Sequence, residues 1–211
     1  MVFCNPDKNC EKCERLRQFR LQNRQKFPTY HNAPVESFGP IDAELLVIGM
    51  APGLHGANQT GRPFTNDGAG DTLMSALKKF GFATGEYARR KDDGFELLNA
   101  RITNTVRCVP PQNKITALEV KNCRPFLKEE IESMKNLKVI LAVGKDAHDA
   151  ALETLGYRKT DFKFTHGGVH HLQKQNIFLV SSYHTSRYNI NTGRLTQAMF
   201  DNVIKTTKDL L

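Results

Sequence analysis

The stretch LLVIGMAPGLHGANQTGRPFTNDGAG, residues 45–70, decides the fold class of this chain. It begins with four apolar residues, 45–48, that predict a buried parallel strand, and an apolar pattern of helical period follows over 73–80. Between the two lies a loop, 49–70, rich in glycine and polar side chains. A loop of this kind at the carboxyl end of a strand is where open α/β sheets place their ligands and their chemistry.

Strand-like and helix-like segments alternate along the rest of the chain. The residue pattern predicts strands at 45–49, 101–106, 138–143 and 177–182, and helices at 11–27, 70–82, 116–134, 145–155 and 195–204. The proline- and glycine-broken segment 28–42 is predicted to be a loop, and 161–172 a short hairpin or an irregular strand. The alternation predicts a single three-layer α/β/α domain over residues 1–211, with a central, mainly parallel, four-stranded sheet.

Composition narrows the class of protein. The chain has 211 residues and 39% hydrophobic content, as expected of one globular domain. Its apolar runs are far shorter than the about 20 residues of a membrane-spanning helix. Because the start, MVFCNPDKNCEKC, lacks the basic and then apolar pattern of a secretion signal, we expect a cytoplasmic location.

The charge balance favours an anionic partner. Thirty basic residues against 22 acidic ones give a net charge of +8, and basic residues gather at 12–26 and 89–91. Such clusters can grip the phosphates of a nucleic acid without reading its sequence. The alternative is that both clusters are solvated surfaces.

Four of the five cysteines have a pattern that can bind a metal. Cys10 and Cys13 form a C-x-x-C pair, and Cys108 and Cys123 follow later in the chain. In a cytosolic protein, clustered cysteines more often bind metal than form disulfides, and four thiolates favour zinc or an iron–sulfur cluster. The alternative is that Cys108 and Cys123 are small core residues. Cys4 has no evident role.

Polar side chains at three predicted strand ends form a candidate site. The loop 49–70 carries His55, Phe64 and Asp67, Asn104 ends the second strand, and His184 follows the last. These ends meet at one edge of a parallel sheet. A buried amide such as that of Asn104 is either bonded to the backbone or open to a ligand. Asp67 has an alternative role as the N-cap of the helix that follows it.

These motifs resemble those of the uracil-DNA glycosylase superfamily, and especially its family 5, or type B, enzymes. The similarity covers nearly the whole chain: CEKC, GMAPGLHGANQTGRPFTNDGAG, TNTVRCVPP, Cys123 and SYHTSRYNINTGRLT. The resemblance implies a uracil-DNA glycosylase fold and a structural 4Fe-4S cluster held by Cys10, Cys13, Cys108 and Cys123, with zinc as the alternative metal.

The resemblance also implies roles for individual residues. Catalytic roles fall to Asp67, Asn104 and His184; base-binding roles to Gly49, Ala51, His55, Phe64, Asn104 and His184; DNA-contacting roles to Arg187, Tyr188, Asn189 and Arg194. Ala51 stands where better-known uracil glycosylases have an aspartate that orients water, and Thr185 and Arg187 stand where other branches have prolines.

The activity implied is repair of DNA. The resemblance predicts a monomeric, nucleoid-associated enzyme that extrudes uracil from double-stranded or single-stranded DNA and hydrolyses its glycosidic bond, leaving an abasic site. The small side chain of Ala51 predicts a pocket that also admits hypoxanthine and other deaminated bases. Two alternatives remain: a non-catalytic, metal-stapled nucleic-acid-binding module, and a nucleosidase that acts on free nucleosides.

Overall fold

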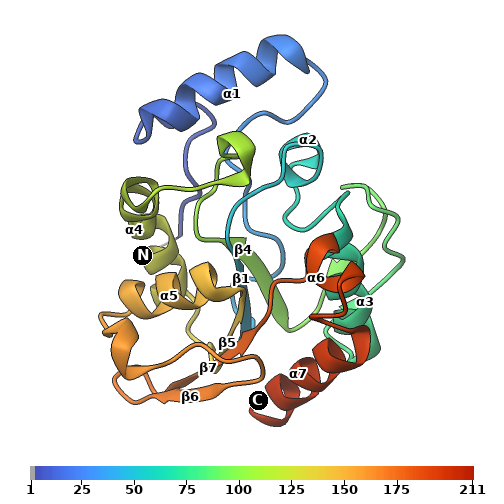
Figure 1. Cartoon of the computed structure of the whole chain (residues 1–211), viewed down its shortest axis with the longest axis vertical. Helices are drawn as coiled ribbons and strands as arrows, with labels where there is room; N and C mark the ends of the chain where they lie inside the picture. Colours follow the sequence, from blue (N-terminus) through green and yellow to red (C-terminus); the bar gives the residue numbers. More distant parts are fainter. Residues whose placement is uncertain (1–2) are drawn as a thin grey trace.

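The computed structural model describes residues 3–211, and a five-stranded sheet of order β4-β1-β5-β7-β6 lies at its centre (Figure 1). The strands are β1 Leu45–Gly49, β4 Ala100–Asn104, β5 Val139–Val143, β6 Val169–Leu172 and β7 Ile177–Ser182. The strands β4, β1, β5 and β7 are parallel, and β6 is antiparallel to β7. Every residue of β1, β4 and β5 is buried, as expected of strands in a parallel sheet that is covered on both faces.

The predicted four-stranded sheet was wrong by one strand. The segment expected to form a hairpin or an irregular strand over 161–172 contributes β6 at the edge of the sheet. Only Leu172 of this strand is buried, so it lacks the nearly complete burial of the other four. A short antiparallel ribbon, β2 Ala83–Thr84 with β3 Glu96–Leu97, was also not predicted.

All five predicted helices are present, with ends within a few residues of those expected. They are α1 Glu14–Lys26, α3 Gly68–Lys79, α4 Ala117–Ser133, α5 Lys145–Thr154 and α7 Gln197–Asp209. Two short helices, α2 Ala57–Thr60 and α6 Arg187–Asn191, lie inside loops, and 3-10 turns occur at Pro111–Asn113 and Lys159–Asp161. Within residues 3–211, no helix combines the length and the apolar character needed to cross a bilayer.

Helices cover both faces of the sheet, as the three-layer prediction requires. Alternate residues of β1 point to opposite sides: Leu45 and Val47 pack in a core with α3 and α7, whereas Leu46 and Ile48 pack in a core with α4 and α5. Figure 1 shows α1 and α2 beyond one end of the sheet rather than on a face. The functional loops lie at this end.

The register brings the candidate residues together. Gly49, the last residue of β1, pairs with Asn104, the last residue of β4. On the other side of β1, Val143 at the end of β5 pairs with Ser182 at the end of β7, two residues before His184. The loops after β1, β4 and β7 therefore leave the sheet along one edge.

Candidate active site

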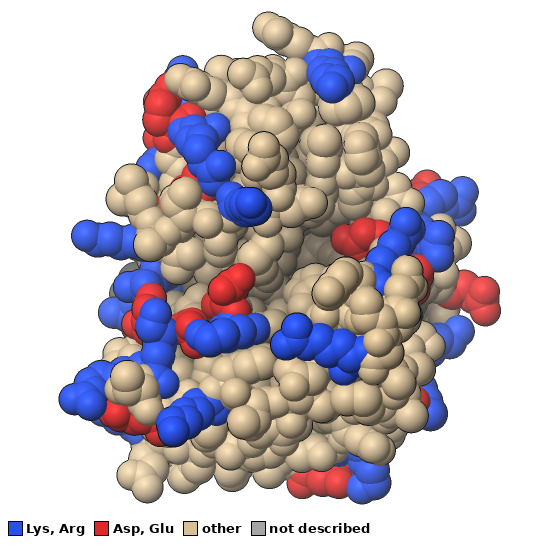
Figure 2. All heavy atoms as spheres, in the orientation of Figure 1, with Lys and Arg blue, Asp and Glu red and all other residues tan. Residues whose placement is uncertain are grey.

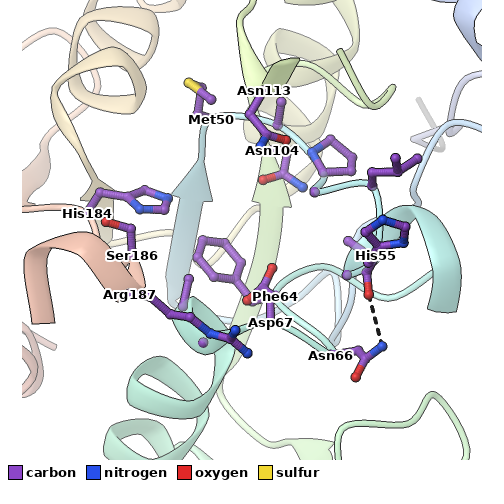
Figure 3. A pocket seen from close by; sticks show the side chains of 18 of the residues that line it. Met50, His55, Phe64, Asn66, Asp67, Asn104, Asn113, His184, Ser186 and Arg187 are labelled. Atoms are coloured by element: carbon purple, nitrogen blue, oxygen red, sulfur yellow. Dashed lines mark hydrogen bonds between the residues drawn. The ribbon is translucent and has the colours of Figure 1, made fainter. Parts of the chain in front are cut away.

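A cavity of about 490 Å³ opens at this edge of the sheet (Figure 3). Its walls come from the loop after β1, the turn before α3, the segment after β4 and the loop after β7. The predicted side chains that line it are Ala51, His55, Phe64, Asp67, Asn104, His184 and Arg187. The volume suits a small planar molecule held by a few polar groups on a mainly apolar surface.

The Phe64 ring and the His184 ring lie against the same space. Their centroids are 6.4 Å apart with 29° between the ring planes. Figure 3 shows the two rings side by side at the centre of the cavity, with Asn104 above Phe64. Phe64 lies in the segment between β1 and α3; its side chain is buried, and its backbone is in the left-handed region at φ +50°.

Gly49 makes room for this arrangement without lining the cavity itself. A Cβ at Gly49 would lie 2.6 Å from the Asn104 Oδ1 atom and 2.7 Å from the Phe64 ring. The absence of a side chain therefore allows the ring and the amide to meet over the end of β1. The predicted base-binding role of Gly49 is thus indirect in this geometry.

Asn104 and His184 leave hydrogen-bonding atoms open toward the cavity. Asn104 is 4% exposed, and within residues 3–211 neither its amide nor the His184 ring has a hydrogen-bond partner. Burial lowers the pKa of His184, and Asp146 opposes this shift only in part. The ring is therefore neutral near pH 7 and carries one N–H to donate.

The backbone of His184 is held from two sides. The Asn189 Nδ2 atom donates to the His184 carbonyl at 2.7 Å, and Gly144, at φ +102°, leaves space for the His184 side chain beside it. Asn189 was predicted to contact DNA, but its side-chain Nδ2 atom instead donates to this carbonyl inside the protein.

Asp67 caps helix α3, as the alternative interpretation expected. Its Oδ1 atom accepts the Gly70 N–H at 2.8 Å. The same carboxylate lines the cavity, and Oδ2 lies beside Gly56, where a Cβ would approach it to 2.8 Å. Burial raises the pKa of Asp67, while the N–H groups of Gly70 and Ala69 act in the opposite direction. Capping and a role in the cavity are therefore compatible.

His55 lies at the mouth of the cavity and is exposed. Its Nδ1 atom is 3.1 Å from the Tyr30 hydroxyl, and its carbonyl accepts from the Asn66 side chain at 2.9 Å. Figure 3 shows it across the cavity from His184. The sequence reasoning missed Asn113, which lines the same cavity from the turn after β4. Asn113 is the last residue of the turn sequence PPQN, and no motif marked it.

A family model of the uracil DNA glycosylase superfamily matches residues 36–208, which include this cavity and all five strands of the sheet. The chain belongs to the uracil-DNA glycosylase superfamily. It is 37% identical over 207 residues to a type-5 uracil-DNA glycosylase of Pyrobaculum aerophilum, an alignment that covers 96% of this chain and 89% of the relative.

Two further relatives cover different shares of the chain. A type-5 uracil-DNA glycosylase of Thermus thermophilus is 37% identical over 206 residues, covering 95% of this chain and 93% of the relative. A type-4 uracil-DNA glycosylase of Pyrobaculum aerophilum is 31% identical over 152 residues, covering 72% of this chain and 63% of that protein.

In this member of the uracil-DNA glycosylase superfamily, α6 borders the cavity. Arg187 begins α6 and lies so close to α3 that a Cβ at Gly68 would be 2.4 Å from its Cγ atom. Tyr188 is 72% exposed, and the Arg194 guanidinium lies over the Tyr183 ring at 4.7 Å. Arg187, Tyr188 and Arg194 are thus exposed, whereas Asn189 is partly buried.

Several residues of the two predicted basic clusters bind acidic side chains or backbone carbonyls of the protein itself. Arg15 bonds Glu119, Arg17 bonds Glu11, and Arg89 bonds Asp71. Arg20 is buried, and Arg24 donates to backbone carbonyls. Figure 2 shows a hollow in this face with mainly uncharged walls and with Lys and Arg spread around it among acidic residues. Lys12, Lys26, Arg90 and Lys91 of these clusters are exposed, so a phosphate-binding role of the clusters stays a prediction.

The four predicted cysteine ligands line one small cavity in this uracil-DNA glycosylase homologue. Cys10 and Cys13 reach it from the N-terminal segment, Cys108 from the loop after β4, and Cys123 from α4. The Arg20 Nη1 atom is 3.6 Å from the Cys108 sulfur, and the Asn122 Nδ2 atom is 3.7 Å from the Cys13 sulfur. Exposed Cys4 is outside this set.

The thiols do not adopt a metal-binding geometry in the described part of the chain. Within residues 3–211, no group of three or more His, Cys, Asp or Glu side chains is arranged to hold a metal ion. Burial raises the pKa of Cys108 to about 12, although Arg20 opposes this. The structure therefore supports the convergence of the four cysteines and leaves the metal itself a prediction.

Proposed function

We propose that this chain is a uracil-DNA glycosylase, which extrudes uracil from DNA and hydrolyses the bond between N1 of the base and C1′ of the deoxyribose. The observation that carries the proposal is the cavity in which the face of Phe64, the open amide of Asn104 and the neutral ring of His184 meet. A planar ring, an amide and an N–H donor match the flat face, the imide edge and a carbonyl of uracil.

The reaction separates charge, and different groups meet each charge. As the C1′–N1 bond breaks, its electron pair leaves with the base, and the neutral His184 ring donates its N–H to the base as it becomes an anion. Preorganised donors of this kind contribute about 3 kcal/mol each in comparable sites. Asn104 holds the imide edge, and Phe64 stacks on the ring.

The sugar is left as an oxocarbenium ion, which water attacks at C1′. The Asp67 carboxylate lies in the cavity wall with Oδ2 beside Gly56, so it is suited to orient this water and to stabilise the cation. A water proton passes to solvent or to the departing base, and the products are free uracil and an abasic site. Ala51 also lines the cavity, but its methyl side chain has no polar atom that could orient the water.

The four cysteines fit a 4Fe-4S cluster, with zinc as the alternative. Four thiols border one cavity, Arg20 and Asn122 direct N–H groups at two of the sulfurs, and the buried Nε atom of Arg20 has no partner within residues 3–211. A bound cluster would supply a structural link between the N-terminal segment, the loop after β4 and α4. No step of the reaction passes through it.

Three narrower parts of the proposal concern the substrate and its setting. The small Ala51 side chain favours a cavity that also accepts hypoxanthine, which undetectable hypoxanthine release would refute. We further propose that the protein works as a monomer on double-stranded or single-stranded DNA. DNA as the substrate implies a nucleoid-associated, cytoplasmic protein.

The test is release of free base from three 5′-labelled duplexes that contain U·G, U·A or T·A at one position. Chromatography should detect uracil from the first two only, and heat with alkali should cleave the labelled strand at that position. His184→Ala and Asn104→Ala should each lower the single-turnover rate about 100-fold or more, whereas His171→Ala, an exposed histidine on β6, should match the wild type. If the protein bound the duplexes without releasing base, the nucleic-acid-binding module would be favoured. If it released uracil from free deoxyuridine but not from the duplexes, the nucleosidase would be favoured.

A further inference from the structure

Two residues of the loop that carries Phe64 have strained backbones. Phe64 has φ +50° and Asn66 has φ +64°, both in the left-handed region that favours glycine. For other residues this conformation costs about 1–3 kcal/mol each and persists only where the surroundings enforce it. The turn places the Phe64 ring over the end of β1, so whatever enforces the turn also sets the position of the ring.

The Tyr87 hydroxyl binds both strained residues. It donates to the Phe64 carbonyl at 3.0 Å and accepts from the Asn66 N–H at 3.3 Å. The start of α3 is packed against the same point, because a Cβ at Gly70 would lie 1.9 Å from the Phe64 carbonyl oxygen and 2.7 Å from the Tyr87 hydroxyl. Burial raises the pKa of Tyr87 to about 12, so the hydroxyl keeps its proton.

A buried ion pair fixes the segment from which Tyr87 comes. Arg62 binds Asp93 through two bonds of 2.8 Å, and the side chains are 3% and 0% exposed. The Arg62 Nε atom also donates to Thr65 at 2.8 Å, and its guanidinium lies 5.6 Å from the Tyr87 ring centroid. The pair therefore ties residues 87–95 to the turn at 62–66.

Asp93 is built into this segment as a permanent anion. It accepts the N–H groups of Ala88 at 2.9 Å and Phe95 at 3.1 Å in addition to Arg62. Burial alone would raise the pKa of Asp93, but Arg62 and these N–H groups outweigh burial and hold the pKa well below its usual range. A charged pair so completely bonded is costly to disrupt from one side.

We propose that Tyr87 and Asp93 are positioning residues that hold the Phe64 ring at the depth at which an extruded uracil stacks on it. Neither lines the cavity, and neither belongs to a motif of the site. They act through the backbone of residues 64–66, where Tyr87 closes the strained turn and Asp93 anchors Arg62. The inference rests on the proposed function, because it assigns the ring a base to bind.

The test compares Tyr87→Phe with Tyr157→Phe. The first variant removes the two bonds to the turn and keeps the ring packed on Phe95; the second removes a hydroxyl that accepts the Lys174 N–H at 2.9 Å outside the cavity. For each protein we would measure inhibition by free uracil, kcat and KM on a U·G duplex, and Tm, with activity measured well below Tm.

Because the ring contacts the base only after extrusion, Tyr87→Phe should raise the inhibition constant for uracil and lower kcat, both about five- to tenfold, a change of the size that loss of the hydroxyl's hydrogen bonds to the turn can produce. The KM for DNA should stay within twofold of the wild type. Tyr157→Phe should leave all three unchanged. A purely structural role predicts a lower Tm with wild-type uracil inhibition and kcat, and that result would overturn the inference.

Asp93→Asn tests the same contact if Tyr87→Phe does not fold. It keeps the shape of the side chain and removes the charge that anchors Arg62, so it should weaken uracil inhibition in the same direction, with folding checked by circular dichroism. Wild-type uracil inhibition in a folded Asp93→Asn would also contradict the proposal. If the wild-type protein itself released no base, the proposed function would be wrong. That outcome is distinct from a wild-type protein that releases base and a Tyr87→Phe variant that behaves like it, which would contradict only the positioning role.

Discussion

Asp67 combines two tasks within one carboxylate. Its Oδ1 atom caps α3, and its Oδ2 atom stays on the side of Gly56. An asparagine in its place would keep the cap, since both residues are good N-caps, but would lose the charge. The two tasks can therefore be separated by substitution.

We expect Asp67→Asn to keep its Tm and lose most of its excision rate, about tenfold or more if the carboxylate orients water. Asp67→Ala should lose the rate and also about 1 kcal/mol of stability. Burial raises the pKa of Asp67, so its carboxylate gains a proton at a higher pH than an ordinary aspartate does. As the pH is lowered, the wild-type rate should therefore begin to fall at a pH above the usual pKa range of aspartate. If Asp67→Asn excised uracil at the wild-type rate, Asp67 would have no role in orienting water and would serve only as the N-cap of α3.

Gly49 offers the sharpest test of the crowding at the end of β1. Gly49→Ala places a methyl group within 2.7 Å of both the Phe64 ring and the Asn104 amide, which must then move apart. We expect a loss of excision of about 100-fold with DNA binding retained, because losing the alignment of a bound group by about 1 Å costs this much.

The matched control is Gly53→Ala in the same loop, where the nearest side-chain atom would be Asp67 Oδ2 at 3.8 Å. Gly53→Ala should keep most of the activity. Equal activities of the two variants, measured in single turnover, would contradict the crowding described at Gly49.

The site residues that sequence could predict are those at strand ends. Phe64, Asn104 and His184 were identified because apolar runs mark the strands and parallel strands end at one edge. Tyr87 and Asp93 could not be identified this way. Asp93 is 31 residues from Arg62, in a segment with neither a motif nor an apolar period, and its importance appears only when the chain folds back.

At the scale of elements, burial decided what could be predicted. Strands β1, β4, β5 and β7 are almost entirely buried and were found within two residues of their bounds. Strand β6 is mainly exposed, and α6 has only five residues with an N-cap from Ser186, so neither had a usable period. The paired charges of α1 also escaped prediction, because Glu119 of α4 lies 104 residues from Arg15.

The four cysteines bring together the N-terminal segment, the loop after β4 and helix α4, and iron is the metal that we expect them to bind. Purified under anaerobic conditions, the protein should be brown and contain about four irons per chain, as a 4Fe-4S cluster has. Cys108→Ala and Cys123→Ala should lose the iron and lower Tm by several degrees, whereas Cys4→Ser should keep both. A colourless protein with one bound zinc per chain would contradict the cluster and leave the alternative metal.

At the scale of the whole molecule, buried titratable groups make stability depend on pH. His148 is fully buried, with Nδ1 2.7 Å from the Ser181 hydroxyl and Nε2 2.9 Å from the Phe162 carbonyl. Burial lowers the pKa of His148, and it also lowers those of His166 and His184. Below about pH 6.5 the unfolded chain therefore binds protons that the folded chain does not.

We expect stability to fall as pH is lowered from 7.5 to 5, by up to about 1.4 kcal/mol per pH unit for the fully buried His148 and by less for the partly exposed His166 and His184. His148→Asn should reduce this slope, and His171→Asn, at an exposed position, should keep it. Thermal unfolding at a series of pH values measures it. A slope that His148→Asn leaves unchanged would mean that His148 does not contribute.

The whole molecule brings three loops of one sheet edge to a single cavity, and a structure of the protein with free uracil and abasic DNA tests this most directly. The account predicts the uracil ring stacked on Phe64, with its imide edge on the Asn104 amide and a carbonyl within hydrogen-bond distance of the His184 ring. Uracil bound elsewhere, or bound in this cavity without contact to Phe64 and His184, would contradict it.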